Sequence, residues 1–151
     1  KINEKELWHV IGKELESKKL MNLNESLLDR IFQKHCSLNN SMINLSKKLS
    51  QKGITVGILS NTEPASYSAI EKLTSLDHFE YKFLSYNIGH LKPNPEIYRH
   101  VIDNVQFPKE ELFFIDDLKS NVESARSEGI DSVQYTSHNE LLKECQIRNI
   151  I

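Results

Sequence analysis

Residues 111–121 read ELFFIDDLKSN, and this stretch decides the expected fold because a short apolar strand runs directly into two neighbouring carboxylates. Leu112 to Ile115 form a continuous apolar run, which is typical of a strand covered on both faces in a parallel sheet. Asp116 and Asp117 follow at its carboxyl end, where open α/β sheets place their ligands. The next residues have helical spacing up to Gly129, a residue suited to the left-handed position past a helix end.

Two interpretations of the adjacent aspartates are open. Like charges close together in a partly dry crevice raise each other's pKa, and a divalent cation removes that repulsion. Mg²⁺ prefers one or two carboxylates together with waters and substrate phosphates, which fits such a pair. In the alternative interpretation, Asp117 caps the amino end of the following helix and Asp116 is a solvated neighbour.

The length and composition of the chain are those of an ordinary globular domain. Its 151 residues suffice for one domain with its own core and for a small second lobe. A net charge of −2 gives no sign of a nucleic-acid surface. No apolar run approaches the ~20 residues that span a bilayer, and the first residues do not form a signal peptide. We therefore expect a soluble, cytoplasmic protein without membrane or nucleic-acid partners.

The cysteines and the first residue give two further indications. Cys36 and Cys145 lie far apart without metal-ligand spacing, as expected for buried or free thiols in a reducing compartment. The first residue is Lys1 rather than methionine, so we expect that the chain was cut from something longer.

The first fifty residues are expected to be helical. Apolar residues recur at helical spacing over residues 4–18, Asn24 can cap a second helix, and a third helix stops near Gly53. The character of the sequence then changes, because residues 54–59 are β-branched and apolar and predict a strand.

Short strands alternate with helices from residue 54 onward, which predicts a three-layered α/β fold with a parallel sheet. The last helix is expected to begin at a capping box formed by Ser137 and Glu140. The expected strands cover residues 54–59, 81–84, 112–115 and 132–135. We divide the chain into a helical portion, residues 1–50, and an α/β portion, residues 51–151.

Polar side chains follow three of the expected strand or loop tips. Ser60 and Asn61 supply a hydroxyl and an amide, and Lys92 supplies a cation. The two aspartates supply carboxylates that could hold Mg²⁺, and phosphoryl transfer needs such donors, positive charge and metal around the phosphate oxygens. Each residue has a plain alternative, since Ser60 and Asn61 can be turn or capping residues and Lys92 a solvated surface lysine. Their shared side of one predicted sheet favours the phosphate interpretation.

Three segments resemble motifs of the haloacid dehalogenase (HAD) superfamily, in that family's order and with sensible spacing. They are GILSNT at residues 57–62, LKPNPEIY at residues 91–98, and FFIDD at residues 113–117 together with Asn121. The helical first portion resembles part of that family's inserted cap domain. Most members are Mg²⁺-dependent phosphatases, and some dehalogenate. The resemblance implies a HAD-like Rossmannoid sheet with a partial amino-terminal helical cap.

The resemblance also implies which residues handle the phosphate. Lys92 would be catalytic, pairing with the phosphate and with the nucleophilic carboxylate. Ser60 would donate a hydrogen bond to the transferring phosphoryl group, and Asn61 and Thr62 would line the same substrate pocket.

The metal site is implied in the same way. Asp117 would be a direct Mg²⁺ ligand, with Asp116 as a second ligand or as a supporting catalytic acid. Asn121 would orient these groups from behind. Many members carry another aspartate at this position, so the carboxylate count here is slightly lower.

The sequence departs from the family at its first motif. Members carry Asp-x-Asp on their first strand, where one aspartate attacks phosphorus and the other acts as general acid and base. No Asp-x-Asp occurs in these 151 residues, and nothing before Leu49 has the pattern of a strand. Asp29 lies within a helical pattern and is expected to be a surface charge.

By the family's layout, the missing strand belongs in the middle of the sheet, between the strands that end at Leu59 and Ile115. Without it the chain lacks a nucleophile, and Mg²⁺ is expected to bind weakly or not at all. Either the two flanking strands close up, or another segment fills the gap. A second copy of the chain could supply that segment by strand addition.

Two classes of function stay open. The first is a HAD-type phosphatase of a small phosphorylated metabolite, present here as a truncated chain that is inactive alone. The second is a non-catalytic HAD-like binding or regulatory module. Retention of Ser60, Lys92 and Asp117 together favours the first. A response-regulator receiver also uses paired acids, a hydroxyl residue and a lysine, but there the acids come first in the chain and here they come last.

Overall fold

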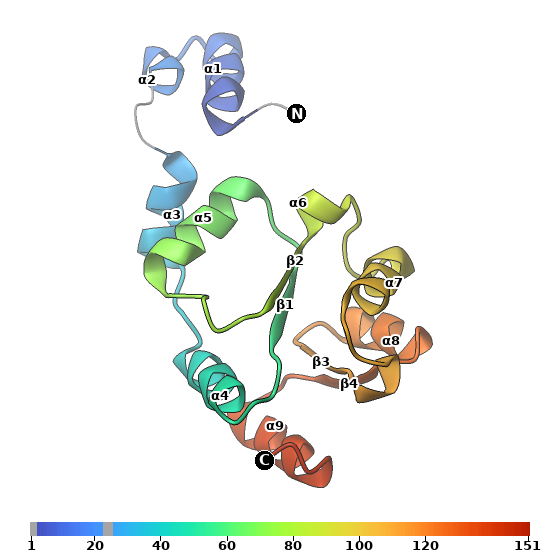
Figure 1. Cartoon of the computed structure of the whole chain (residues 1–151). Coiled ribbons are helices and arrows are strands. Elements are labelled where there is room, and N and C mark those ends of the chain that lie inside the picture. The colour runs from blue at the N-terminus through green and yellow to red at the C-terminus, as the bar shows by residue number, and fades with distance from the viewer. Residues whose placement is uncertain (1–2, 23–25) are drawn as a thin grey trace. The chain divides into compact units, whose positions relative to one another are not determined.

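The computed structural model describes residues 3–22 and 26–151 of the chain (Figure 1). In chain order the elements are α1 (Glu4–Glu14), α2 (Lys18–Met21), α3 (Leu27–His35), α4 (Asn40–Gln51), β1 (Gly57–Ser60), α5 (Pro64–Leu73), β2 (Tyr81–Leu84), α6 (Ser85–Ile88), α7 (Pro95–Asn104), a 3-10 turn (Lys109–Glu111), β3 (Phe113–Asp116), α8 (Lys119–Ser127), β4 (Asp131–Gln134) and α9 (His138–Ile147). The expected alternation of strands and helices is confirmed. Asn24, expected to cap the second helix, lies outside the described residues.

The chain divides into two compact units, each made of two segments. The first unit comprises Lys1–Leu38 and Glu63–Leu76, and the second comprises Asn39–Thr62 and Asp77–Ile151. This division groups α4 with the strands and α5 with the first helices. The role of residues 1–50 as a cap stays a prediction.

The described elements of the first unit are helices, in which α1 packs on α2 and α3 packs on α5. Helix α1 begins with a capping box. The Asn3 side-chain oxygen accepts the Glu6 N–H at 2.9 Å, and the Glu6 carboxylate accepts the Asn3 N–H at 3.1 Å. These two bonds satisfy backbone donors that the first helical turn cannot pair internally.

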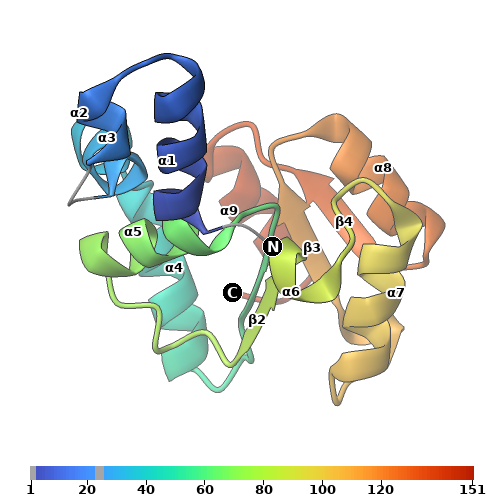
Figure 2. The same ribbon diagram turned by 90° about the horizontal axis from the view of Figure 1, so that it is seen from above.

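The strands belong to the second unit and pair in parallel. Within the described residues, β1 pairs with β2 and β3 pairs with β4, so the sheet consists of two separate two-stranded pieces. Figure 2 shows β3 and β4 side by side. The expected parallel pairing of the strands is confirmed. The first strand is shorter than the expected residues 54–59, because regular pairing begins only at Gly57.

Successive side chains of β3 point to opposite faces, as in any strand, and each face is covered by helices. Phe113 and Ile115 pack in a cluster with residues of α4 and α9, whereas Phe114 packs in a second cluster with residues of α7 and α8. The expected three layers are therefore present. The buried members of the two clusters are Leu45, Val133, Leu141 and Cys145 in the first, and Ile97, Tyr98, Ala125 and Ile130 in the second.

Both cysteines are free thiols, Cys36 exposed and Cys145 buried in the core, as expected. Burial raises the pKa of the Cys145 thiol. In the part of the chain that the structure describes, no helix is both long and apolar enough to cross a membrane.

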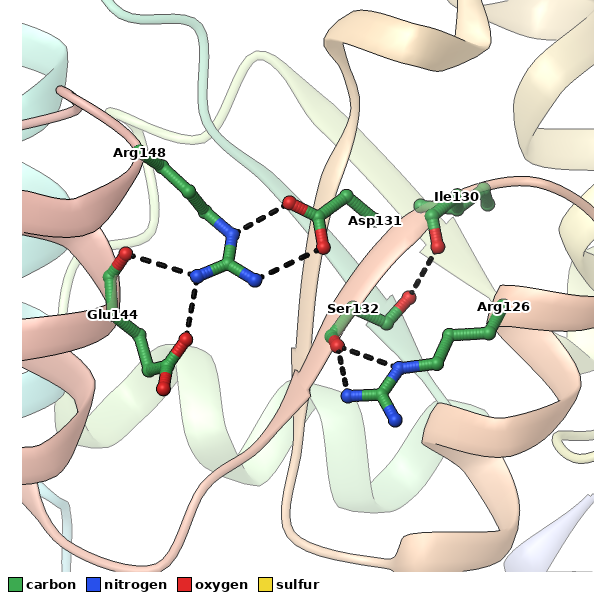
Figure 3. Close-up of polar contacts among 6 residues, drawn as sticks. All are labelled: Arg126, Ile130, Asp131, Ser132, Glu144 and Arg148. Atoms are coloured by element: carbon green, nitrogen blue, oxygen red, sulfur yellow. Dashed lines mark hydrogen bonds and ion pairs between the residues drawn. The ribbon is translucent and has the colours of Figure 1, made fainter.

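Two arginines fasten the amino end of β4 to the neighbouring helices (Figure 3). Arg148 donates to both carboxylate oxygens of Asp131 at 2.5 and 3.1 Å and to the Glu144 carboxylate at 2.5 Å. The Arg148 guanidinium also lies 4.8 Å from the centre of the Phe113 ring. From α8, Arg126 donates twice to the Ser132 carbonyl, at 2.9 and 2.5 Å.

Replacing Arg148 with methionine is expected to lower the free energy of unfolding by about 1 kcal/mol, because the variant keeps the apolar stem but loses a networked, part-exposed ion pair. Urea denaturation followed by circular dichroism measures this change. Lys143→Met is the matched control, since Lys143 pairs with Glu140 while remaining 63% exposed. Equal effects of the two substitutions would contradict a structural role for the Arg148 network.

Candidate active site

Lys92 joins the carboxyl ends of β1 and β3. Its ammonium donates to Asp116 Oδ2 at 2.6 Å and to the backbone oxygen of Leu59 at 2.7 Å. The side chains of this pair are 10% and 6% exposed, and the ammonium lies 5.6 Å from the centre of the Phe114 ring. Lys92 is therefore held in a nearly buried ion pair, and its alternative interpretation as a solvated surface lysine is wrong.

Asp116 is surrounded by hydrogen-bond donors. Its Oδ1 accepts the Leu118 N–H at 2.9 Å and the Asn121 side-chain amide at 2.9 Å, while Oδ2 faces Lys92. Burial opposes ionisation of this carboxyl, but the hydrogen bonds from Lys92, Leu118 and Asn121 together hold its pKa below the ordinary value. Asp116 is therefore ionised at neutral pH. This state suits a metal ligand or an electrostatic role and does not suit proton donation.

The capping interpretation of the aspartates is wrong in its details. Helix α8 begins after Leu118, which has no side-chain cap, and the carboxylate that accepts an amide at this point is that of Asp116. Asp117 is exposed, and within the described residues its carboxylate makes no hydrogen bond or ion pair, although its carbonyl accepts the Gln134 side-chain amide at 2.8 Å. Asp117 is thus free to bind a ligand from solution.

Asn121 is held by α7. The Asn121 backbone oxygen accepts the Tyr98 hydroxyl at 2.8 Å, and the Tyr98 ring meets Phe114 edge-on with centres 5.7 Å apart. Burial raises the pKa of Tyr98, so its hydroxyl stays protonated and can donate. Helix α7 opens at Asn94, whose side chain accepts the Glu96 N–H at 2.9 Å.

Asn61 and Thr62 connect the loop after β1 to its neighbours. The Asn61 side chain accepts the Lys92 N–H and donates to the Lys92 carbonyl, both at 2.8 Å. The Thr62 N–H donates to the Ser85 hydroxyl at 3.0 Å, and that hydroxyl donates to the Thr62 carbonyl at 2.9 Å. In the structure Asn61 therefore positions Lys92, and its predicted contact with substrate stays a prediction.

Ser60, Lys92 and Asp116 thus lie at one end of the strands, as the sequence predicts, because Ser60 is the last residue of β1 and Asp116 the last residue of β3. Sequence reasoning missed the positioning roles of Tyr98 and Ser85. Tyr98 was visible only as the end of a motif, and no sequence signal marks Ser85.

The two aspartates supply part of the donor set that Mg²⁺ prefers. Among the described residues, no group of three or more His, Cys, Asp or Glu side chains lies close enough to hold a metal ion. Two adjacent carboxylates nevertheless match the preference of Mg²⁺ for one or two carboxylates plus waters and substrate oxygens. Asp117 is available for this role, whereas Asp116 would have to share its oxygens with Lys92.

A family model described as haloacid dehalogenase-like hydrolase matches residues 2–135 of the chain. The chain belongs to this family. The HAD motifs at residues 57–62, 91–98 and 113–117 all lie inside the matched region.

Relatives with known names include phosphatases and a larger enzyme. A D-ribitol-5-phosphate phosphatase of Bacteroides thetaiotaomicron is 32% identical over 91 residues, which are 56% of this chain and 44% of that protein. Bifunctional epoxide hydrolase 2 of Rattus norvegicus is 28% identical over 115 residues, covering 73% of this chain and 21% of that protein. The chain therefore spans only about a fifth of the length of this epoxide hydrolase.

Among solved structures, a HAD family enzyme of Bacteroides thetaiotaomicron has a TM-score of 0.71 and is 25% identical. The likeness covers 88% of this chain and 70% of that one, and the crystals hold an aspartate-to-alanine mutant with magnesium and inorganic phosphate. This similarity extends the family assignment to the three-dimensional fold.

Proposed function

We propose that this HAD-family chain carries the phosphate-binding half of a cytoplasmic, Mg²⁺-dependent phosphatase that acts on a small phosphorylated metabolite. The observation that carries the proposal is the Lys92 ammonium, fixed between the Leu59 carbonyl and Asp116 where two strands end. The phosphatases among the relatives support the same reaction class.

The residues of the chain divide the task of holding a phosphate. Lys92 would face the phosphate oxygens with the N–H donor that its two hydrogen bonds leave over, since an ammonium has three donors. Ser60 would donate from its hydroxyl at the end of β1. Asp117, with Asp116, would hold Mg²⁺, which when bound neutralises charge on the phosphoryl oxygens.

The chain itself offers no suitable nucleophile. The sequence contains no Asp-x-Asp. The Asp116 oxygens are occupied by three donors, and a hydrogen-bonded carboxylate is a weakened nucleophile. We infer that the nucleophilic carboxylate of this reaction comes from outside residues 1–151, because they contain no Asp-x-Asp.

The alternative is a non-catalytic module that binds phosphate groups without hydrolysing them. It is favoured by the same absence of Asp-x-Asp, and by the fact that Asn61 serves to hold Lys92. Both proposals require phosphate binding at Lys92, and they differ only in turnover.

The first experiment measures hydrolysis of a generic aryl phosphate by the 151-residue chain with and without MgCl₂. We expect no turnover above that of Asp117→Asn, which serves as the control for contaminating phosphatase. Magnesium-dependent turnover that Asp117→Asn abolishes would mean that a carboxylate of this chain is the nucleophile after all.

A second arm separates the phosphatase from the binding module. A strand ending in Asp-x-Asp is fused ahead of Lys1, and turnover is assayed beside phosphate binding by ³¹P NMR. A phosphatase should regain Mg²⁺-dependent turnover that falls at least about 100-fold in Lys92→Met. Phosphate binding without turnover in the fused protein would instead favour the binding module.

A further inference from the structure

The loops that follow β1 and β2 are joined just beyond the point where the two strands stop pairing. The last residue pair of this ladder is Ser60 with Leu84. Beyond it, the Ser85 hydroxyl accepts the Thr62 N–H at 3.0 Å and donates to the Thr62 carbonyl at 2.9 Å. One hydroxyl can do both, because it carries one donor and two acceptor lone pairs. The Ser85 side chain therefore continues the connection between the two chain segments where the backbone pairing ends.

The two bonds between Ser85 and Thr62 lie where solvent replaces them poorly. Ser85 is 3% exposed, and buried polar groups that lose a partner are costly. Thr62 is also the last residue of its segment in the second unit, since Glu63 belongs to the first. Ser85 therefore fixes the loop after β1 at the residue where the chain leaves the unit that carries the strands.

The residue before Thr62 bonds to Lys92 in a similar way. The Asn61 side chain accepts the Lys92 N–H and donates to the Lys92 carbonyl, both at 2.8 Å. Lys92 lies outside any helix or strand, and among the described residues no backbone group bonds its N–H or its carbonyl. The position of the Lys92 backbone therefore depends on Asn61, which in turn is covalently joined to the residue that Ser85 holds.

We propose that Ser85 is a positioning residue of the candidate phosphate site. By fixing Thr62 it fixes the neighbouring Asn61. Asn61 then holds the backbone from which the Lys92 ammonium reaches the Asp116 carboxylate at 2.6 Å. The Ser85 hydroxyl bonds only Thr62 within the described residues, so its effect on Lys92 passes through the loop. The effect on phosphate binding rests on the proposed function, whereas the coupling of Ser85 to the Lys92 backbone does not.

Two backbone amides report this coupling without any ligand. Amide hydrogen exchange is measured by NMR on the unmodified full chain and on Ser85→Ala. The Thr62 N–H loses its acceptor and should exchange at least about tenfold faster, and the Lys92 N–H, which Ser85 does not bond, at least about threefold faster. Ser85→Thr keeps the hydroxyl and should restore the protection of both amides. Faster exchange at Thr62 with unchanged exchange at Lys92 would overturn the proposal.

Ser132→Ala is the matched control for a general loss of stability. Ser132 is 1% exposed, and its hydroxyl likewise donates to a backbone carbonyl, that of Ile130 at 2.9 Å, but on β4. Exchange rates are compared after correction for the stability of each variant, measured by urea denaturation. Ser132→Ala should then leave exchange at the Lys92 N–H unchanged. Equal acceleration at Lys92 in both serine variants would mean that any destabilisation opens this loop, and the proposal would be wrong.

Phosphate affinity tests whether Ser85 acts through Asn61. Binding of inorganic phosphate is followed by ³¹P NMR in Ser85→Ala, in Asn61→Ala and in the double variant. Ser85→Ala should weaken binding about three- to tenfold. Adding it to Asn61→Ala should have little further effect, because the connection to Lys92 is already broken. Strictly additive effects of the two substitutions would overturn this order of action.

The positioning role and the proposed function fail in different ways. If the unmodified chain binds no phosphate, the phosphate-binding function is contradicted, while hydrogen exchange at the Lys92 N–H still decides whether Ser85 positions that backbone. If the unmodified chain binds phosphate and Ser85→Ala changes neither the affinity nor the exchange at Lys92, the proposed function stands and the positioning role of Ser85 is wrong.

Discussion

Replacing Lys92 with methionine will lower the free energy of unfolding by about 3 kcal/mol, because it leaves the Asp116 carboxylate in a buried place without its cation. The two side chains are 10% and 6% exposed, so water cannot replace the lost partner easily. Methionine keeps most of the apolar stem, and its effect therefore reports mainly the charge. Urea denaturation at neutral pH, with the slope checked for two-state behaviour, measures the change.

The pH dependence of the free energy of unfolding provides a control for the Lys92→Met prediction. In the folded chain the pKa of Asp116 is lowered, so between that pKa and the ordinary value near 4 the unfolded state binds more protons. The contribution of Asp116 to stability is therefore fully present above about pH 4 and is lost as the pH falls below it. In Lys92→Met the pKa is no longer held down by the ammonium, and burial raises it. The difference between the two proteins should shrink between pH 7 and pH 3.

A double variant completes the cycle. Asp116→Asn removes the charge but keeps an oxygen for the Leu118 N–H. Combined with Lys92→Met it should recover about 1 to 2 kcal/mol relative to the sum of the single changes, as coupled neighbours do. The two groups would be shown not to interact in solution if the free-energy changes of the single variants added up strictly and the dependence of stability on acid pH stayed unchanged.

The sequence predicted the strands and their polar ends well, and the reasons are local. The apolar run at residues 112–115 and the β-branched residues before Ser60 specify strands by composition alone. The sequence predicted that Lys92 and Asp116 share one side of the sheet, because the carboxyl ends of parallel strands meet at one edge. It did not predict their ion pair. The gap in the sheet followed from the absence of any strand pattern before Leu49 combined with a family resemblance.

The missed features depend on contacts between residues far apart in the chain. From the sequence, Asn61 was interpreted as a pocket or turn residue. Only the fold shows that its side-chain amide bonds both the N–H and the carbonyl of Lys92, 31 positions away. The hydroxyl of Tyr98 reaches the Asn121 carbonyl because α7 and α8 pack together. The pKa of Asp116 likewise depends on three donors from separate places. Such arrangements leave no periodic signal in a sequence.

Converting Asn121 to aspartate is expected to destabilise the chain by about 3 kcal/mol at neutral pH without Mg²⁺, because a buried donor becomes a second buried charge. Asn121 is 3% exposed, and its amide lies 2.9 Å from Asp116 Oδ1. Asn121→Ala is the matched control, which loses the hydrogen bond but adds no charge and should cost about 1 to 2 kcal/mol. Thermal and urea unfolding of both variants measure the difference.

Only the Asn121→Asp variant should change its stability deficit with acid. Two carboxylates in contact raise the pKa of the pair above ordinary values, so the folded form of Asn121→Asp takes up a proton before the unfolded form does. Its deficit relative to the unmodified chain should therefore decrease as the pH falls from 7 towards 5. Asn121→Ala has no such pair, and its deficit should stay constant over the same range. A constant deficit in both variants would mean that the introduced carboxylate turns to solvent.

Magnesium supplies the decisive comparison, with stability rather than turnover as the readout. If Asp116 and Asp117 lie where a cation binds, an additional carboxylate beside them should strengthen the site, since affinity grows with ligand charge. Millimolar MgCl₂ should then raise the melting temperature of Asn121→Asp more than that of Asn121→Ala, by mass action on the folded state. NaCl at matched ionic strength controls for screening. An equal rise in the melting temperature of the two variants with MgCl₂ would contradict a metal site at this end of the strands. Lys92 would then remain the group proposed to bind phosphate.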